Sequence, residues 1–267
     1  MVKGKRFVGI FDSGVGGLTV LKEIVALLPQ EHIIYLGDTA RVPYGTRSPK
    51  TVIKYSRENV RFLRRWELKV LVVACNTSSS VSLPTLKEEN EIPVVGVIEP
   101  GVRRAVEVTR TGRIGVIGTE GTIRSGAYQR RIREMDPHLQ VFATPCPLFV
   151  PLVEEGWIDD PISRLVAHRY LRPLKEEGID VLILGCTHYP LLEGVIREVM
   201  GEGIELINSA KETAREVKRQ LERGGMLEPP GAEGERKFFV TDNPGKFTEI
   251  GKRFLGVRID RVEEVEL

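Results

Sequence analysis

The strongest constraint on the fold is a regular alternation of short apolar runs with longer amphipathic segments. The apolar runs are rich in valine and isoleucine, which suits strands buried on both faces, and the amphipathic segments have helical spacing. This alternation predicts parallel sheets covered by helices, an α/β fold. We expect strands over residues 6–11, 33–36, 70–74, 94–97, 113–118, 139–143, 180–184, 205–206 and 237–241. We expect helices over residues 17–28, 49–66, 77–89, 101–109, 122–135, 161–177, 190–200 and 210–223.

A long-range internal sequence similarity, called the echo below, divides this pattern into two halves. Residues 70–77 (VLVVACNT) resemble residues 181–188 (VLILGCTH) in type and spacing, and residues 8–13 resemble residues 114–119 in the same way. The two matching cysteines are 111 residues apart, and the matching segments 8–13 and 114–119 are 106 residues apart. Two offsets that nearly agree predict two similar, pseudo-symmetric open-sheet α/β domains. We expect the active site in the cleft between them.

The domain boundaries follow from the same echo. The second half begins again just before Arg113, so the chain is expected to cross between domains near residues 97–101. The tail after about residue 213 has no counterpart at the end of the first half. We therefore predict a first domain made of residues 1–98 and 213–267, and a second domain made of residues 99–212.

Charge and composition exclude several classes of protein. Lys and Arg number 39 against 37 Asp and Glu, so the net charge of +2 implies no nucleic-acid partner. The apolar runs are far shorter than the roughly 20 residues that cross a bilayer, and the first residues lack the apolar core of a signal peptide. Three cysteines and four scattered histidines do not suit a disulfide framework or a metal site. We expect a cytoplasmic protein without bound metal.

Two of the cysteines occupy matching positions at strand ends. Cys75 ends an apolar run and is followed by helix-capping residues, and Cys186 ends the echoing run before Thr187 and His188. A helix N-terminus favours the thiolate, so we expect a lowered pKa for these thiols. Ligands of open α/β sheets bind beyond the carboxyl ends of the strands, which predicts that both thiols face the cleft. A single cysteine in this place is more often a small buried apolar residue, but a matching pair favours a function.

Two opposed thiols suit one demanding reaction. One group removes a proton from one face of a carbon while the other delivers a proton to the opposite face, and the stereocentre is inverted. Asp12 and Ser13 end another predicted strand and precede a glycine-rich turn with neither a dinucleotide nor a phosphate-loop spacing. Asp12 is then an acid–base assistant of Cys75 or an anchor for a substrate ammonium group, unless it only caps the helix.

Further candidates flank these positions. Tyr44 and Gly45 belong to a loop that either lines the pocket or forms an ordinary turn. His188 lies two residues from Cys186, close enough to stabilise a thiolate or relay a proton. Glu154 or Glu155 could orient this histidine, although carboxylates on a helix are usually solvated.

The remaining cysteine, Cys146, lies between two prolines and has no echo in the other half of the chain. We expect it to pack in the core without a function.

Four segments together resemble the bacterial glutamate racemases. They are residues 9–18 (GIFDSGVGGL), 38–45 (DTARVPYG), 74–77 (ACNT) and 185–190 (GCTHYP), and they occur in order along nearly the whole chain. The resemblance implies interconversion of L- and D-glutamate without a cofactor, with D-glutamate used for peptidoglycan. It also implies a homodimer.

The resemblance implies roles for particular residues. Cys75 would act on the D-enantiomer with help from Asp12, and Cys186 would act on the L-enantiomer with help from His188, itself supported by Glu154. The residues that would hold the substrate are Asp12, Ser13, Tyr44, Gly45, Asn76, Thr77, Thr187 and His188.

Three alternatives remain open from the sequence. The first is a racemase acting on aspartate or on a hydantoin. The second is a Cys–His acyl-transfer enzyme, which needs only one of the two cysteines and forms a thioester. The third is a two-lobed module that binds an amino acid without catalysis, for which both thiols would be dispensable.

Overall fold

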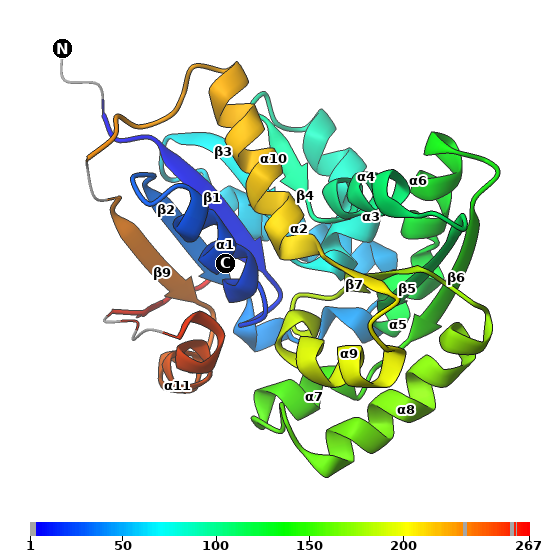
Figure 1. Cartoon of the computed structure of the whole chain (residues 1–267). Coiled ribbons are helices and arrows are strands. Elements are labelled where there is room, and N and C mark those ends of the chain that lie inside the picture. The colour runs from blue at the N-terminus through cyan, green and yellow to red at the C-terminus, as the bar shows by residue number, and fades with distance from the viewer. Residues whose placement is uncertain (1–3, 232–233, 257–258, 260) are drawn as a thin grey trace.

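The computed structural model describes residues 4–231, 234–256, 259 and 261–267, and it shows two parallel β-sheets surrounded by helices (Figure 1). The predicted α/β fold is therefore confirmed. The first sheet contains β1 (Phe7–Asp12), β2 (Ile33–Gly37), β3 (Leu68–Val73), β4 (Val94–Gly96), β9 (Arg236–Val240) and β10 (Glu263–Glu264), in the order β10-β9-β2-β1-β3-β4. The second contains β5 (Arg113–Gly118), β6 (Gln140–Pro145), β7 (Val181–Gly185) and β8 (Glu205–Asn208), in the order β6-β5-β7-β8.

Helices connect these strands. The α-helices are α1 (Leu18–Leu27), α2 (Pro49–Leu63), α3 (Asn76–Glu88), α4 (Ile98–Val108), α5 (Glu120–Ser125), α6 (Ala127–Met135), α7 (Phe149–Glu154), α8 (Pro161–Glu176), α9 (Glu193–Met200), α10 (Ser209–Arg223) and α11 (Pro244–Leu255). Short 3-10 helices are η1 (Thr39–Arg41), η2 (Tyr44–Thr46) and η3 (Tyr189–Leu192). In the part of the chain that the structure describes, no helix combines the length and apolarity that a bilayer crossing requires.

The local sequence explains the central strands and the well-marked helix starts. Every residue of β1, β3 and β7 is buried, as expected for valine- and isoleucine-rich strands covered on both faces. α2 begins at Pro49 after Ser48, whose side chain accepts a hydrogen bond from the backbone N–H of Thr51. α8 begins at Pro161 after Asp160 with the same type of cap. A capping side chain followed by proline at the first helical position fixes where a helix begins.

The structure differs from the predicted elements in several places. The helix expected over residues 122–135 is split into α5 and α6, because Gly126 adopts a left-handed conformation with φ 68°. α4 begins at Ile98, three residues before the expected start. The sequence analysis also missed α7, α11 and the short strand β10.

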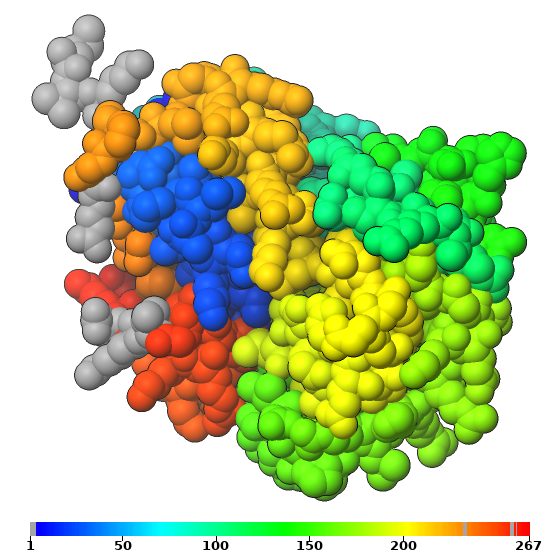
Figure 2. All heavy atoms as spheres, in the orientation of Figure 1, coloured from blue at the N-terminus to red at the C-terminus, as the bar shows by residue number. Residues whose placement is uncertain are grey.

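The C-terminal part of the chain returns to the first sheet. β9 pairs in parallel with β2, and β10 pairs with β9 at the edge. α10 packs on both α1 and α4, and Figure 2 shows it running between the blue and the blue-green parts of the molecule. The exact domain boundaries, 1–98 with 213–267 and 99–212, stay a prediction.

Each sheet has one position at which the order of its strands reverses direction. β1 pairs with β2 on one side and β3 on the other, and β5 pairs in the same way with β6 and β7. Ligands of such sheets bind beyond the carboxyl ends of the strands at this reversal. The topology therefore directs attention to the residues that follow β1, β3, β5 and β7.

Candidate active site

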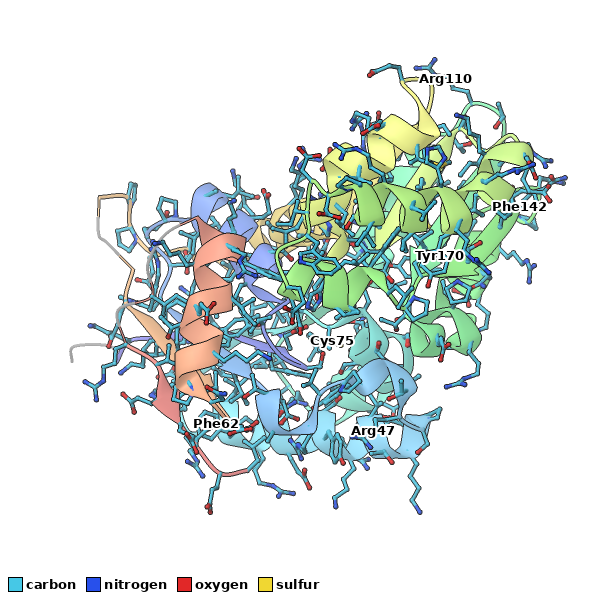
Figure 3. All side chains as sticks on the ribbon, turned by 90° about the horizontal axis from the view of Figure 1, so that it is seen from below. Arg47, Phe62, Cys75, Arg110, Phe142 and Tyr170 are labelled. Atoms are coloured by element: carbon cyan, nitrogen blue, oxygen red, sulfur yellow. The ribbon has the colours of Figure 1, made fainter. Side chains whose placement is uncertain are left out.

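Cys75 lies just after β3 as the N-cap residue of α3, and Figure 3 places it near the centre of the molecule. Its side chain is 5% exposed, and its Sγ lies 3.4 Å from the hydroxyl oxygen of Ser13. Burial raises the pKa of the Cys75 thiol to about 12, the nearby Asp12 raises it further, and the bond to Ser13 only partly opposes this. The expected lowering of the pKa at a helix N-terminus is therefore wrong for Cys75, because desolvation outweighs the helix effect.

Cys186 follows β7 and belongs to a relay of three side chains. Its Sγ lies 3.8 Å from Nδ1 of His188, whose Nε2 lies 3.0 Å from Oε1 of Glu154 at the end of α7. Burial alone would lower the pKa of His188, but its hydrogen bonds to Cys186 and Glu154 raise that pKa to about 10. Burial alone would raise the pKa of Glu154, but the hydrogen bond to His188 lowers it below its usual value. Of the two candidate carboxylates, only Glu154 contacts His188, while Glu155 is exposed.

Asp12 ends β1 and is fully buried. Its Oδ2 accepts a hydrogen bond of 2.9 Å from the backbone N–H of Gly14, and among the described residues its Oδ1 meets no donor. Burial raises the pKa of Asp12, whereas the charge of His188 and backbone N–H groups, including that of Gly17, lower it. Gly17 is required for this close approach, since a Cβ there would lie 2.5 Å from the Cβ of Asp12. Asp12 thus offers one unoccupied acceptor inside the protein.

Asn76 and Thr77 open α3 directly after Cys75. Tyr128 donates a hydrogen bond of 2.7 Å to Oδ1 of Asn76, and the buried Nδ2 meets no acceptor in the described part of the chain. The Thr77 hydroxyl lies 2.9 Å from that of Thr119 and 3.2 Å from that of Thr122. The site therefore offers an unoccupied donor at Asn76 and a cluster of hydroxyl groups at Thr77.

The sequence analysis missed Thr119, Thr122 and Tyr128 as site residues. The signal for Thr119 lay in the internal echo, since residues 114–119 match residues 8–13 and Thr119 takes the place of Ser13. Thr122 and Tyr128 follow on α5 and α6, and they meet Thr77 and Asn76 only because the two halves pack together.

Tyr44 packs against Cys75 in a small apolar cluster and so lies beside the predicted site. Its hydroxyl donates to Asp38 and accepts a 3.1 Å hydrogen bond from Nδ2 of Asn59. Its neighbour Gly45 faces the second half, where a Cβ on it would lie 2.9 Å from that of Thr119.

Thr187, the residue after Cys186, is held by a hydrogen bond from helix α1. Its carbonyl oxygen accepts a 2.8 Å hydrogen bond from the hydroxyl of Thr19 on α1. Its own hydroxyl lies 3.5 Å from Nδ1 of His188. Thr187 therefore links the loop after β7 to the first sheet's helix α1.

The arrangement provides two buried sulfur atoms with different surroundings. Cys75 is a neutral thiol beside a carboxylate, whereas Cys186 lies beside a histidine that is cationic at neutral pH. The two sit close enough for a charge on Cys186 to raise the pKa of Cys75. The described residues contain no cluster of three His, Cys, Asp or Glu side chains suited to a metal ion.

Comparison with known proteins identifies the family. A family model described as Asp/Glu/Hydantoin racemase matches residues 8–217. A glutamate racemase from Geobacter metallireducens is 56% identical over 262 residues, which cover 98% of this chain and 97% of the relative.

Two crystal structures show the same fold over nearly the whole chain. Glutamate racemase isoform RacE1 from Bacillus anthracis superposes with a TM-score of 0.94 at 45% identity, covering 98% of both chains. The glutamate racemase from Francisella tularensis, solved in complex with D-glutamate, gives a TM-score of 0.92 at 38% identity, again covering 98% of both chains. The chain therefore belongs to the Asp/Glu/Hydantoin racemase family of isomerases and, within it, to the glutamate racemases.

Proposed function

We propose that this chain interconverts L- and D-glutamate with Cys75 and Cys186 as two opposed acid–base groups. The observation that supports this most directly is the placement of both sulfur atoms beyond the carboxyl ends of β3 and β7, at the winding reversals of the two sheets. A hydrolase or acyl-transfer enzyme needs one nucleophile, whereas inversion of a carbon centre needs a group on each face.

In the direction from L- to D-glutamate, Cys186 removes the α-proton and Cys75 delivers one to the opposite face. The cationic His188 lies 3.8 Å from the sulfur atom that accepts the proton, and the raised pKa of the Cys75 thiol keeps that thiol protonated. A proton donor on the Cys75 side is what the reaction of the L-enantiomer requires. Proton transfer in the reverse direction exchanges the two roles.

The unoccupied polar atoms suit an amino-acid substrate. The Oδ1 atom of Asp12 is an acceptor for the substrate ammonium group, and Nδ2 of Asn76 is a donor for a carboxylate. The hydroxyl group of Ser13 contacts the Cys75 sulfur, and Thr77 and Thr187, which follow the two cysteines in sequence, carry further hydroxyl donors. We assign these residues, with Tyr44, Gly45 and His188, to substrate binding.

The product points to a place in metabolism. D-glutamate is a building block of peptidoglycan, so we propose that the enzyme supplies cell-wall synthesis.

We further propose that the enzyme acts as a homodimer, and light scattering on the purified protein tests this. A monomer at assay concentration would contradict the dimer without affecting the proposed reaction.

The activity is tested by incubating the purified, reduced and chelator-treated protein with L-glutamate in D₂O. We expect deuterium at the α-carbon by NMR together with loss of optical rotation, and the same end point from D-glutamate. Aspartate and a hydantoin run in parallel test the substrate class. Turnover of either one in preference to glutamate would overturn the proposed substrate, and no exchange with any of them would overturn the racemase assignment.

Glu154→Gln should shift the alkaline limb of the pH–activity profile to lower pH. The pKa of His188 is raised to about 10 partly by its bond to the Glu154 carboxylate, so removing that charge lowers the pKa of His188. Activity that needs cationic His188 is then lost at a lower pH than in the wild type. The profile of kcat/KM between pH 6.5 and 10.5 measures the shift.

Glu155→Gln is the matched control, because Glu155 is the next residue and is exposed. We expect its profile to follow the wild type throughout. If both variants lose activity at the same alkaline pH as the wild type, Glu154 does not support the charge of His188.

A further inference from the structure

Tyr128 connects the two cysteine-bearing strand ends, although it lies on α6 and far from both in sequence. Its side chain is fully buried in the apolar cluster of the second sheet, among residues of α4, β5 and β7. Its hydroxyl donates a 2.7 Å hydrogen bond to Asn76, the residue after Cys75. One rigid side chain anchored in one half of the molecule therefore holds a polar group in the other half.

The ring of Tyr128 also lies against the residue before Cys186. A Cβ placed on Gly185 would lie 3.1 Å from Cε2 of Tyr128 and 3.4 Å from its Cζ. That space is available only because residue 185 is glycine. The ring thus packs on the end of β7, while the hydroxyl reaches the start of α3.

We propose that Tyr128 is a positioning residue, which fixes the Asn76 amide so that its N–H groups face the substrate carboxylate, and which aligns the loop of Cys75 with that of Cys186. The proposal rests on the proposed racemisation of glutamate. An asparagine amide presents an acceptor at one end and donors at the other. Because the Tyr128 hydroxyl takes the acceptor end, the buried donor end remains without a partner in the described chain and is available to a carboxylate.

Removing only the hydroxyl tests this arrangement. In Tyr128→Phe the ring still packs on Gly185, but Asn76 loses the donor that orients its amide. We expect KM for glutamate to rise roughly tenfold with a smaller fall in kcat, as for the loss of one buried hydrogen bond. Because the two enantiomers have equal free energy, kcat/KM must fall by the same factor in both directions, which provides an internal check.

A double-mutant cycle separates positioning from a general loss of stability. If Tyr128 acts through Asn76, then Tyr128→Phe has no further effect on KM in the Asn76→Ala background. Tyr189→Phe is the matched control, since Tyr189 is equally buried and donates a 2.8 Å hydrogen bond to the backbone carbonyl of Cys146. We expect the control to keep KM within about twofold, because no side chain of the site depends on that hydroxyl.

Two outcomes would overturn the proposal. One is a folded Tyr128→Phe enzyme whose KM stays at the wild-type value. The other is a rise in KM of equal size in the wild-type and Asn76→Ala backgrounds, which would show that Tyr128 acts independently of Asn76. A wild-type protein without activity on glutamate would instead contradict the proposed function, so the two failures are distinguishable.

Discussion

Replacing Cys75 with alanine is expected to lower glutamate racemisation at least about a thousandfold, and replacing Cys186 is expected to do the same. Among the described residues, no acid–base side chain forms a hydrogen bond with both sulfur atoms. The described hydrogen bonds place Ser13 on the Cys75 side and His188 with Glu154 on the Cys186 side.

The two variants should differ in proton exchange, although both lose racemisation. In Cys75→Ala, Cys186 keeps His188 and Glu154, so L-glutamate is expected to exchange its α-proton slowly with D₂O without inversion. D-glutamate should remain unlabelled in that variant. Cys186→Ala should show the reverse preference. NMR of each enantiomer in D₂O, combined with polarimetry, measures exchange and inversion separately.

The third cysteine provides the matched control for these variants. Cys146 is also buried and free, and its Sγ lies 3.7 Å from the carbonyl oxygen of Thr144. We expect Cys146→Ala to racemise glutamate within about twofold of the wild type, because in the described chain its sulfur bonds to the Thr144 carbonyl and to no group of the proposed reaction. Racemisation above a tenth of the wild-type rate in either Cys75→Ala or Cys186→Ala would rule out the two-thiol mechanism.

The repeated strand–cysteine pattern made the α/β fold predictable, and it placed the two cysteines at the centre of the candidate site. Valine- and isoleucine-rich runs ending in Cys75 and Cys186 fix both the strand type and the edge of the sheet at which the thiols emerge. The echo between residues 8–13 and 114–119 also contained Thr119, but its meaning required the second sheet to be placed beside the first. Local sequence patterns therefore predicted which residues lie at the same edge of a sheet. The contacts of these residues across the two sheets depend on tertiary packing, which the patterns did not predict.

Elements that depend on packing were missed for the same reason. α11 contains Gly245 and Gly251, which weaken helix propensity. Yet a Cβ on Gly251 would lie 2.8 Å from Cδ1 of Ile259 and 3.0 Å from a methyl group of Leu18. The glycine is needed for close packing of α11 on α1. The spacing of apolar residues within the helix does not indicate this requirement.

The pKa of Cys75 shows the limit of local reasoning about charge. A helix N-terminus lowers the pKa of a cysteine that retains some solvent, which is the basis of the sequence prediction. In the folded protein the thiol is nearly fully buried beside Asp12, and both effects raise its pKa. How much solvent reaches a side chain depends on the whole fold, so neighbouring sequence could not supply it.

Lys69→Ala is expected to destabilise the protein by about 3–5 kcal/mol, the usual cost of leaving a buried charge without its partner. The Lys69 side chain, on β3, is 1% exposed, and its Nζ lies 2.5 Å from the carboxylate of Glu31 and 2.8 Å from that of Glu228. It also donates to the backbone carbonyl of Met226 at 3.0 Å. Without the lysine, the fully buried Glu31 would retain only the backbone N–H of Glu228 as a hydrogen-bond partner among the described residues.

This cluster ties the segment after α10 to the amino ends of the first sheet's strands, opposite the edge that carries the thiols. We therefore expect the Lys69→Ala protein to keep the wild-type KM while folded and to unfold at a lower temperature. The thermal unfolding midpoint, measured by calorimetry with and without the substitution, tests the stability, and steady-state kinetics at 25 °C test the site.

Two further variants make the interpretation specific. Lys69→Met combined with Glu31→Leu removes both charges, and it should recover much of the lost stability because no buried ion remains unpaired. Arg172→Ala breaks an exposed pair with Glu176 and should leave the unfolding midpoint unchanged. If the double variant is as unstable as Lys69→Ala, the loss comes from altered packing at β3 and not from an uncompensated charge on Glu31.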